Sequence, residues 1–139
     1  MEKEDAQNIA SLINAQNNLP QDLSCDDVYY GKYFFSKIRY EEKKSEIICC
    51  VRAKRLSFFS IELKHLSVSP NFRRKDFGKM MVYAVEKYAK SENIPIVMAT
   101  SCKTNAGVNR LFEKLGYTSL SEFYNTKTKN TCIIWQKLI

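Results

Sequence analysis

The stretch that decides the fold is Val68-Ser-Pro-Asn-Phe-Arg-Arg-Lys-Asp-Phe-Gly-Lys-Met80. It passes from an apolar segment through a basic turn into a second apolar segment with a different period. Pro70 has no backbone N–H to donate to a neighbouring strand, so a strand that reaches Val68 ends there. After Gly78, apolar residues recur on one face of a helix that runs to about Ser91, namely Met80, Met81, Ala84, Val85 and Tyr88. The sequence therefore predicts a strand, a loop and a helix in immediate succession.

The same junction is suited to bind an anion. The first N–H groups of a helix have no intrahelical acceptor and carry partial positive charge, and Gly78 lets a ligand come close to the backbone. Four cationic side chains surround this helix start: Arg73, Arg74, Lys75 and Lys79. Two interpretations stay open on these residues alone, a cradle for a pyrophosphate and a basic surface loop whose helix is capped by Asp76.

Before this junction, one helix and three strands are predicted. Asp5 to Asn17 places apolar residues at helical spacing and has acidic residues in its first turn. Val28 to Ile38 and Glu46 to Val51 have strand composition and are separated by the polar turn Glu41 to Ser45, which indicates a hairpin. Phe58 to Val68 follows as a third antiparallel strand.

After the central helix, strand and helix alternate again. The predicted elements are a buried strand over Ile94 to Thr100, a helix over Ala106 to Leu115 that stops at Gly116, and strands over Tyr117 to Tyr124 and Cys132 to Leu138, joined by the turn Asn125 to Asn130. This order predicts an α/β (α+β) fold with a mixed sheet. No internal repeat or linker divides the chain, so we expect one domain over residues 1–139.

Composition limits the class of protein. The chain has 139 residues, of which 45% are hydrophobic and 27% charged, so it is long enough to bury a core without disulfides. No apolar run reaches bilayer length, and the polar N-terminus does not resemble a signal peptide. The five cysteines are odd in number and form no C-x-x-C pair. We therefore expect a cytoplasmic protein, and the lone histidine with scattered cysteines predicts no metal site.

The net charge is +7, because 22 lysine and arginine side chains face 15 aspartate and glutamate side chains. Such a charge favours an anionic partner, whether a phosphate compound, a nucleic acid or an acidic protein, without choosing among them. A solvated basic surface with no such partner is the alternative.

Two motifs in this order resemble the GNAT superfamily of N-acetyltransferases. The first is Val-x-Pro-x-x-Arg-x-x-Asp-x-Gly-Lys followed by an amphipathic helix, which is similar to the acyl-CoA-binding pattern Arg or Gln-x-x-Gly-x-Gly or Ala. Arg73 and Gly78 fill the first and last positions, and Asp76 stands where the family usually has glycine. The second is Asn105-Ala-Gly-Val-Asn-Arg-Leu-Phe-Glu-Lys-Leu-Gly-Tyr117, which is similar to Asn-x-x-Ala-x-x-Leu-Tyr-x-x-x-Gly-Phe. The resemblance covers Ile61 to Tyr117.

The resemblance implies a mixed, mostly antiparallel central sheet with flanking helices and a V-shaped cleft that admits acetyl-CoA. The backbone of Leu66 to Val68 would bind the pantetheine arm and the thioester, Arg74 to Lys79 the pyrophosphate, and Asn105 the cofactor through its side chain. The full set of cofactor-binding residues that it implies is Leu66, Ser67, Val68, Arg73, Arg74, Lys75, Asp76, Phe77, Gly78, Lys79, Asn105 and Phe112.

The family's mechanism needs a base for the amine and an acid for the leaving thiolate. At the position of the usual acidic tyrosine this chain has Phe112, and Tyr117, Tyr124 and Cys102 are the conceivable substitutes, each also explained as a packing or surface residue. A thiolate can also be protonated by water.

Glu62 lies eleven residues before Arg73 and matches the strand glutamate that histone-type members use as base. Strand alternation puts Glu62 and Lys64 on one face and His65 on the other, so Glu62 can equally be an exposed carboxylate paired with Lys64. His65 is the second candidate base. The family position on the following strand is Thr100, which cannot act as one.

These observations predict an acetyl-CoA-dependent N-acetyltransferase that acts on a primary amine, with a protein lysine or α-amino group as first choice. A small amine, such as a polyamine or an antibiotic, and aminoacyl-tRNA are the alternatives for the acceptor. A non-catalytic module of the same fold that binds nucleic acid or protein is the alternative for the function, since Phe112 and Asp76 both depart from the family pattern.

Overall fold

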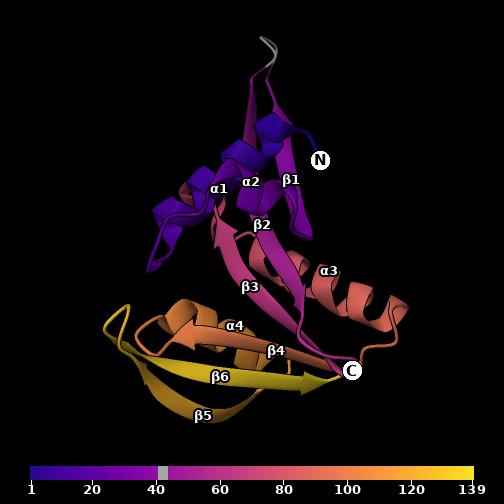
Figure 1. Ribbon diagram of the computed structural model, residues 1–139, viewed down its shortest axis with the longest axis vertical. Coiled ribbons are helices and arrows are strands. Elements are labelled where there is room, and N and C mark those ends of the chain that lie inside the picture. Colours follow the sequence, from indigo (N-terminus) through magenta and orange to yellow (C-terminus); the bar gives the residue numbers. More distant parts are fainter. Residues whose placement is uncertain (41–43) are drawn as a thin grey trace.

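The structure is a computed structural model that describes residues 1–40 and 44–139. Figure 1 shows its helices and strands, which are α1 (Lys3–Gln16), α2 (Cys25–Tyr29), β1 (Tyr33–Arg39), β2 (Ser45–Arg55), β3 (Ser60–Val68), the 3-10 turn η1 (Pro70–Phe72), α3 (Phe77–Ser91), β4 (Ile96–Cys102), α4 (Ala106–Lys114), β5 (Thr118–Asn125) and β6 (Asn130–Leu138). Within the described ranges, no helix combines the length and the apolar character that a membrane span requires.

The six strands form one sheet in the order β1-β2-β3-β4-β6-β5. Only β3 and β4 run parallel, and every other neighbouring pair is antiparallel. Helix α3 provides the crossover between the two parallel strands, which such a connection requires. The predicted mixed, mostly antiparallel sheet with flanking helices is therefore confirmed.

One predicted strand begins too early. Val28 lies in the short helix α2, and β1 starts only at Tyr33. The helix begins with a capping box, in which the Ser24 hydroxyl accepts a hydrogen bond from the Asp27 N–H (3.1 Å) and the Asp27 carboxylate accepts one from the Ser24 N–H (2.8 Å). This local signal outweighs the strand composition of Val28 and the tyrosines after it. Most of the predicted turn Glu41 to Ser45 lies outside the described residues.

Two hydrophobic clusters fill the two faces of the sheet. The larger one packs α3 and α4 against β2, β3, β4 and β6, with Phe112 and Trp135 at its centre. The smaller one packs α1 and α2 against β1 and β2, through Ile9 and Ile13. The adjacent residues Cys49 and Cys50 of β2 face opposite clusters, Cys49 the larger one and Cys50 the smaller.

Strands β3 and β4 separate along their length (Figure 1). Their parallel pairing runs only from Ser60 opposite Ile96 to Leu63 opposite Ala99. Beyond these residues β3 stays paired with β2 as far as Val68, and β4 stays paired with β6 as far as Cys102. The edges of β3 and β4 that face each other there have no partner strand, so their backbone groups border an opening.

A β-bulge lies where the strands begin to separate. The register passes from Arg52 opposite Lys64 to Cys50 opposite Ser67, so His65 and Leu66 together oppose one residue of β2. His65 has a positive φ of 56°, which bends the strand and turns the residues after it. The extra residue interrupts the strict alternation on which the predicted placement of His65 opposite Glu62 and Lys64 rests, and all three residues line one cavity.

The environment of His65 holds its imidazole neutral. Burial, followed by the positive charges of Lys64, Arg52 and Lys54, lowers the pKa of His65 to about 4. Within the described part of the chain, its Nδ1 atom is buried without a hydrogen-bond partner. Protonation of this side chain therefore opposes folding.

We expect this neutral histidine to make the fold sensitive to mild acid. Because the folded pKa lies below the unfolded value of about 6.5, the unfolded chain binds the extra proton. Above pH 6.5 this histidine has no effect on how the free energy of unfolding depends on pH. As the pH falls from 6.5 towards 4, the free energy of unfolding decreases by up to about 1.4 kcal/mol per pH unit. In His65→Asn, which removes the titration and tolerates a positive φ, unfolding by urea between pH 7 and 4.5 should show a smaller loss of stability than in the wild type. Equal losses in the two proteins would assign the acid sensitivity to other groups.

Candidate active site

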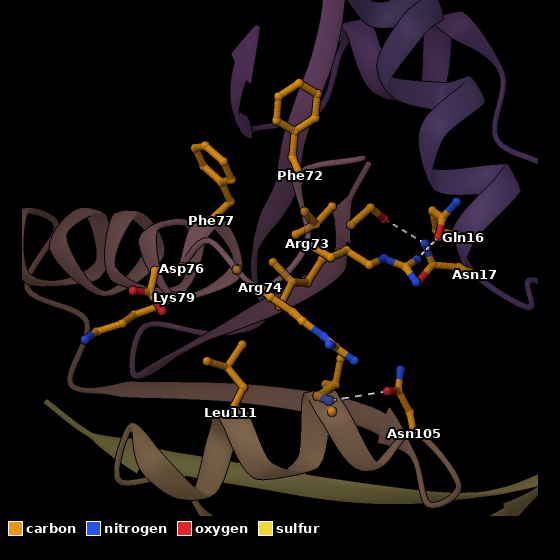
Figure 2. A pocket seen from close by; sticks show the side chains of 16 residues that line it. Gln16, Asn17, Phe72, Arg73, Arg74, Asp76, Phe77, Lys79, Asn105 and Leu111 are labelled. Carbon is orange, nitrogen blue, oxygen red and sulfur yellow. Dashed lines mark hydrogen bonds between the residues drawn. The ribbon is translucent and has the colours of Figure 1, made fainter. Parts of the chain in front are cut away.

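The loop after β3 borders a cavity of about 450 Å³, here called the loop cavity (Figure 2). Its walls come from the end of β3, the loop and first turn of α3, the start of α4 and the end of α1. All predicted cofactor-binding residues line it except Lys75 and Phe112. The sequence motifs therefore converge on one hollow, and the individual roles of these residues as ligands stay predictions.

The loop reaches α3 through two left-handed residues, Arg74 and Asp76, each with a φ of 62°. The first helical hydrogen bond runs from the Met80 N–H to the Asp76 carbonyl (3.0 Å). The preceding N–H groups of Phe77, Gly78 and Lys79 consequently have no acceptor within the helix. Asp76 occupies the N-cap position, but its side chain makes no capping hydrogen bond, so the interpretation that this side chain caps the helix was wrong. Its backbone conformation explains why glycine suits this position in the family pattern.

Gly78 is needed for a close approach between helices. A Cβ atom at this position would lie 3.3 Å from Cδ2 of Leu111 on α4 and 4.0 Å from Cγ2 of Val68 on β3. The first of these distances is tighter than ordinary van der Waals contact. The start of α3 therefore stands directly over α4 and β3, which brings its free N–H groups to the wall of the loop cavity.

The four cationic side chains of the loop point in different directions. Arg73 reaches α1 and donates a hydrogen bond to the Gln16 side chain, whereas Arg74 extends across the cavity towards Asn105 (Figure 2). Lys75 lies over the Phe72 ring, 5.9 Å from its centroid, and does not line the cavity. Lys79 lies at the edge, 5.7 Å from the Tyr83 ring centroid. Arg74 is therefore the cation that faces into the loop cavity most directly.

Asn105 begins α4 and lines the loop cavity. Its side-chain oxygen accepts a hydrogen bond from the Val108 N–H (3.3 Å), which makes it the helix N-cap. Because the oxygen is used in this way, the side-chain NH₂ group is the part of Asn105 that can donate to a ligand.

The end of α1 borders both cavities, although Gln16 and Asn17 were not among the predicted site residues. The Asn17 side-chain amide donates to the Ser67 hydroxyl (2.8 Å) and to the Ile13 carbonyl (2.9 Å). The Ser67 hydroxyl in turn donates to the His65 carbonyl (3.1 Å). These bonds fix α1 to the bulged part of β3. The only signal in the sequence was the position of Asn17 at the end of the predicted first helix.

A second cavity of about 490 Å³, here called the cleft cavity, lies between the separated ends of β3 and β4. It is lined by the residues after α1 as far as Pro20, by Glu62 to Leu66, by Thr100 to Cys102, and by side chains of α4, β5 and β6. Five residues line both cavities: Gln16, Asn17, Leu66, Asn105 and Val108. The two cavities therefore meet at the opening of the strands.

The predicted base lies in the cleft cavity. Glu62 belongs to the part of β3 that still pairs with β4, next to Ile61 and Leu63, which are buried in the larger cluster. No ion pair of Glu62 with Lys64 is present among the described residues. Glu62 does not line the loop cavity. Glu62 thus lines the cleft cavity alone, and its role as the base stays a prediction.

The candidate acids have different locations. Phe112 is 1% exposed, packs against Tyr117 and Trp135, and borders the cleft cavity rather than the loop cavity. Cys102 also lines the cleft cavity, whereas the exposed Tyr124 lines neither cavity.

Tyr117 is not brought to the site. Its hydroxyl donates to the Glu86 carboxylate (2.9 Å), which also accepts from Lys137 (3.0 Å). Burial and the negative charge of Glu86 raise the pKa of Tyr117 far above its ordinary value. Tyr117 lines neither cavity, and its hydroxyl already donates its proton in the hydrogen bond to Glu86. It is therefore unsuited to protonate a leaving group, and we correct the prediction that Tyr117 is a candidate acid.

Comparison with known proteins agrees with this architecture. The structure of the ribosomal-protein-S18-alanine N-acetyltransferase from Escherichia coli matches with a TM-score of 0.75 at 14% identity, covering 100% of this chain and 90% of that one. The structure of the NatC complex bound to Gag peptide and CoA matches with a TM-score of 0.84 at 15% identity, covering 99% and 92%. A GNAT family acetyltransferase from Elizabethkingia anophelis with acetyl-CoA bound gives 0.71 at 16%, covering 93% and 89%.

At these identities the three structures establish the shared fold. A search of curated proteins found no match in sequence. The model of the acetyltransferase (GNAT) family, in contrast, matches residues 7–117, which include both motifs and the whole of the loop cavity. The chain therefore belongs to the GNAT acetyltransferase family, whose members are N-acetyltransferases that use acetyl-CoA as acyl donor.

Proposed function

We propose that this enzyme acetylates the α-amino group at the start of a protein chain. The observation that carries the proposal is the junction of the two cavities, which share Asn17, Leu66 and Asn105. One cavity ends at a basic loop and a helix N-terminus, as an acyl-CoA requires, and the other opens between the strands beside a carboxylate. A donor and an acceptor that enter from these two sides meet where β3 and β4 separate.

The loop cavity has the groups that acetyl-CoA needs. The free N–H groups at the start of α3 and the Arg74 side chain would bind the pyrophosphate. The backbone of Leu66 to Val68, which has a partner strand on one side only, would bind the pantetheine arm through its other edge. When bound, acetyl-CoA supplies the thioester carbonyl that the amine attacks. A backbone N–H of β3 would polarise this carbonyl, and Asn105 would donate its NH₂ group.

Glu62 is the residue that we assign to remove the proton from the incoming amine, directly or through a water molecule. His65 is the weaker candidate, because a base whose pKa is about 4 binds a proton poorly at neutral pH. Within the described part of the chain, no tyrosine lines either cavity. We therefore propose that the leaving thiolate takes its proton from water.

A single carboxylate as the base favours an α-amino group over a lysine as the acceptor. The pKa of an α-amino group is about 7.7–8.0, and that of a lysine is about 10.4. At neutral pH the uncharged, reactive share of an α-amine is therefore roughly 300-fold larger. A single carboxylate as the base is therefore better suited to an α-amine, because fewer acceptor molecules have to lose a proton before they react.

The charges of the cleft cavity also argue against a polyamine. Its ionisable lining includes one carboxylate, Glu62, together with the ammonium group of Lys64 and the neutral His65. A polyamine with several positive charges would need more than one carboxylate. Two of the proteins with this fold are a ribosomal-protein-S18-alanine N-acetyltransferase and the NatC complex bound to Gag peptide and CoA, which supports a peptide acceptor.

The proposal is tested with three acceptors offered together with acetyl-CoA. We expect a lysine-free peptide with a free α-amino group to gain the mass of one acetyl group. A peptide with a blocked N-terminus and an internal lysine, and spermidine, should react at least tenfold more slowly. A faster reaction of the blocked peptide or of spermidine would move the proposal to lysine or to small amines. Whichever acceptor reacts, acetyl-CoA should raise the melting temperature of the protein, because it binds the native state.

Replacing Glu62 by glutamine should separate catalysis from donor binding. We expect Glu62→Gln to lower kcat roughly a hundredfold, because the amide cannot accept the amine proton. The affinity for acetyl-CoA should stay within twofold, because Glu62 does not line the loop cavity. Glu113→Gln is the matched control, since Glu113 is exposed on α4 and lines neither cavity. An unchanged kcat in Glu62→Gln would mean that Glu62 is not the base.

Replacing Asp76 tests how its charge affects the donor. Asp76→Gly and Asp76→Asn both remove a carboxylate beside the proposed pyrophosphate site, and both tolerate the positive φ. We expect both to bind acetyl-CoA several-fold more tightly at low salt, with a smaller gain at high salt. The melting temperature should change little, because no capping bond is lost. Calorimetric titration at two salt concentrations measures the effect, and a gain in neither variant would mean that Asp76 points away from the phosphates.

A further inference from the structure

Two cysteines face each other across the end of the sheet. Cys102 is the last residue of β4, Cys132 belongs to β6, and the two are direct partners in the antiparallel register. Both have free thiols, and both line the cleft cavity. They are 30 positions apart in the sequence, so only the pairing of β4 with β6 brings them together.

The hydrogen-bond pattern defines the geometry of this pair. The next pair outward is bonded, because the Lys103 N–H donates to the Thr131 carbonyl (2.9 Å). The Cys102 carbonyl accepts from the Asn105 N–H (2.9 Å) and from the Asn109 side chain (3.3 Å), both outside β6. Because bonded and non-bonded pairs alternate, Cys102 and Cys132 form a non-hydrogen-bonded pair. Such pairs have Cα atoms about 4.5 Å apart, and disulfides span Cα distances of about 4.4–6.8 Å.

We propose that Cys102 and Cys132 form a dithiol modification site, which a small-molecule disulfide oxidises to a cross-strand disulfide in the wall of the cleft cavity. The site is independent of which amine the enzyme acetylates. The side chains already lie on one face of the sheet, so no strand has to move far to form the bond.

The order of the two steps follows from exposure. Cys102 is partly exposed. Among the described residues, the hydrogen-bond partner of its sulfur atom is the Thr104 hydroxyl (3.1 Å). Cys132 is 8% exposed. Burial, followed by the neighbouring Cys102, raises the pKa of Cys132. Cys102 is therefore the thiol that meets the oxidant first, and Cys132 is the thiol that resolves the intermediate.

With oxidised glutathione as oxidant, the Cys102 thiolate attacks one sulfur atom and releases the first glutathione thiolate. The Cys132 thiolate then attacks the Cys102 sulfur atom of this mixed disulfide and releases the second. The two protein thiols lose two electrons and two protons, and the glutathione disulfide gains them as two thiols. The reaction is balanced without any further reactant.

The other cysteines are unsuited to this chemistry. Cys49 and Cys50 are fully buried on opposite faces of β2, and burial raises the pKa of Cys49 to about 11 and that of Cys50 to about 12. Cys25 is partly exposed on α2, and its thiol contacts the Lys3 carbonyl (3.5 Å). Cys25 thus provides a control thiol of similar exposure.

The test uses the full chain, reduced, desalted and treated with oxidised glutathione at neutral pH before alkylation of the remaining thiols. We expect the number of alkylated cysteines to fall from five to three, with one intramolecular link between the peptides that contain Cys102 and Cys132. Cys25→Ser should form the same link. Cys132→Ser should stop at a stable mixed disulfide on Cys102, and Cys102→Ser should form no link.

Three results would overturn the proposal, all of them measured on the wild-type chain and so independent of whether a variant folds. One is a link that includes Cys25, Cys49 or Cys50 in place of the pair. Another is a glutathione adduct that persists on Cys102 while Cys132 stays a free thiol and is alkylated. The third is retention of all five alkylated thiols. The acetyl-transfer assay plays no part in the readout, so failure here and failure of the proposed acceptor are distinct results.

Discussion

The separation of β3 from β4 is the constraint on which the rest of the site depends. Parallel pairing ends at Leu63 and Ala99, and the bulge at His65 follows immediately. A bulge bends its strand and increases the local twist. The remaining residues of β3 thus follow β2, while β4 follows β6. Without this separation, the backbone of Leu66 to Val68 would be bonded on both sides, and neither cavity would reach the other.

Several long-range contacts hold this opening in shape. The side chain of Asn17 bonds Ser67 beside the bulge, and Gln16 accepts a hydrogen bond from Arg73 in the basic loop. On the opposite side, Gly78 allows α3 to stand close to Leu111 of α4. The end of α1 and the starts of α3 and α4 therefore surround the place where the two cavities meet. Of the four cationic side chains near the loop cavity, Arg74 faces into it most directly, and the free N–H groups of α3 add partial positive charge at its wall.

The buried polar groups explain how the site differs from the family pattern. Phe112 lies in the centre of the larger cluster, where a ring packs against Trp135. The nearby Tyr117 uses its hydroxyl to satisfy Glu86, and Glu86 also pairs with Lys137 of β6. Such a network is costly to disturb, because each member would leave a buried partner unsatisfied. The chain thus has a structural use for Tyr117, and the chemistry that we propose relies on Glu62 and water.

The sequence by itself determined the order of the elements, except for α2, and it grouped most of the residues that line the loop cavity in two motifs. Pro70, Gly78 and the helical spacing after it are local signals, and so is the Asn105 cap, because each acts on residues within one or two turns. The capping box of Ser24 and Asp27 was equally local and was overlooked because strand composition follows it. Only the tertiary structure decided the bulge at His65, since a shift of one residue in register depends on the pairing of β2 with β3. The same holds for Asn17 against Ser67, for Tyr117 against Glu86 and for Cys102 against Cys132. In each of these pairs the two residues are distant in the chain, and no periodicity within a single segment carries information about a partner in another.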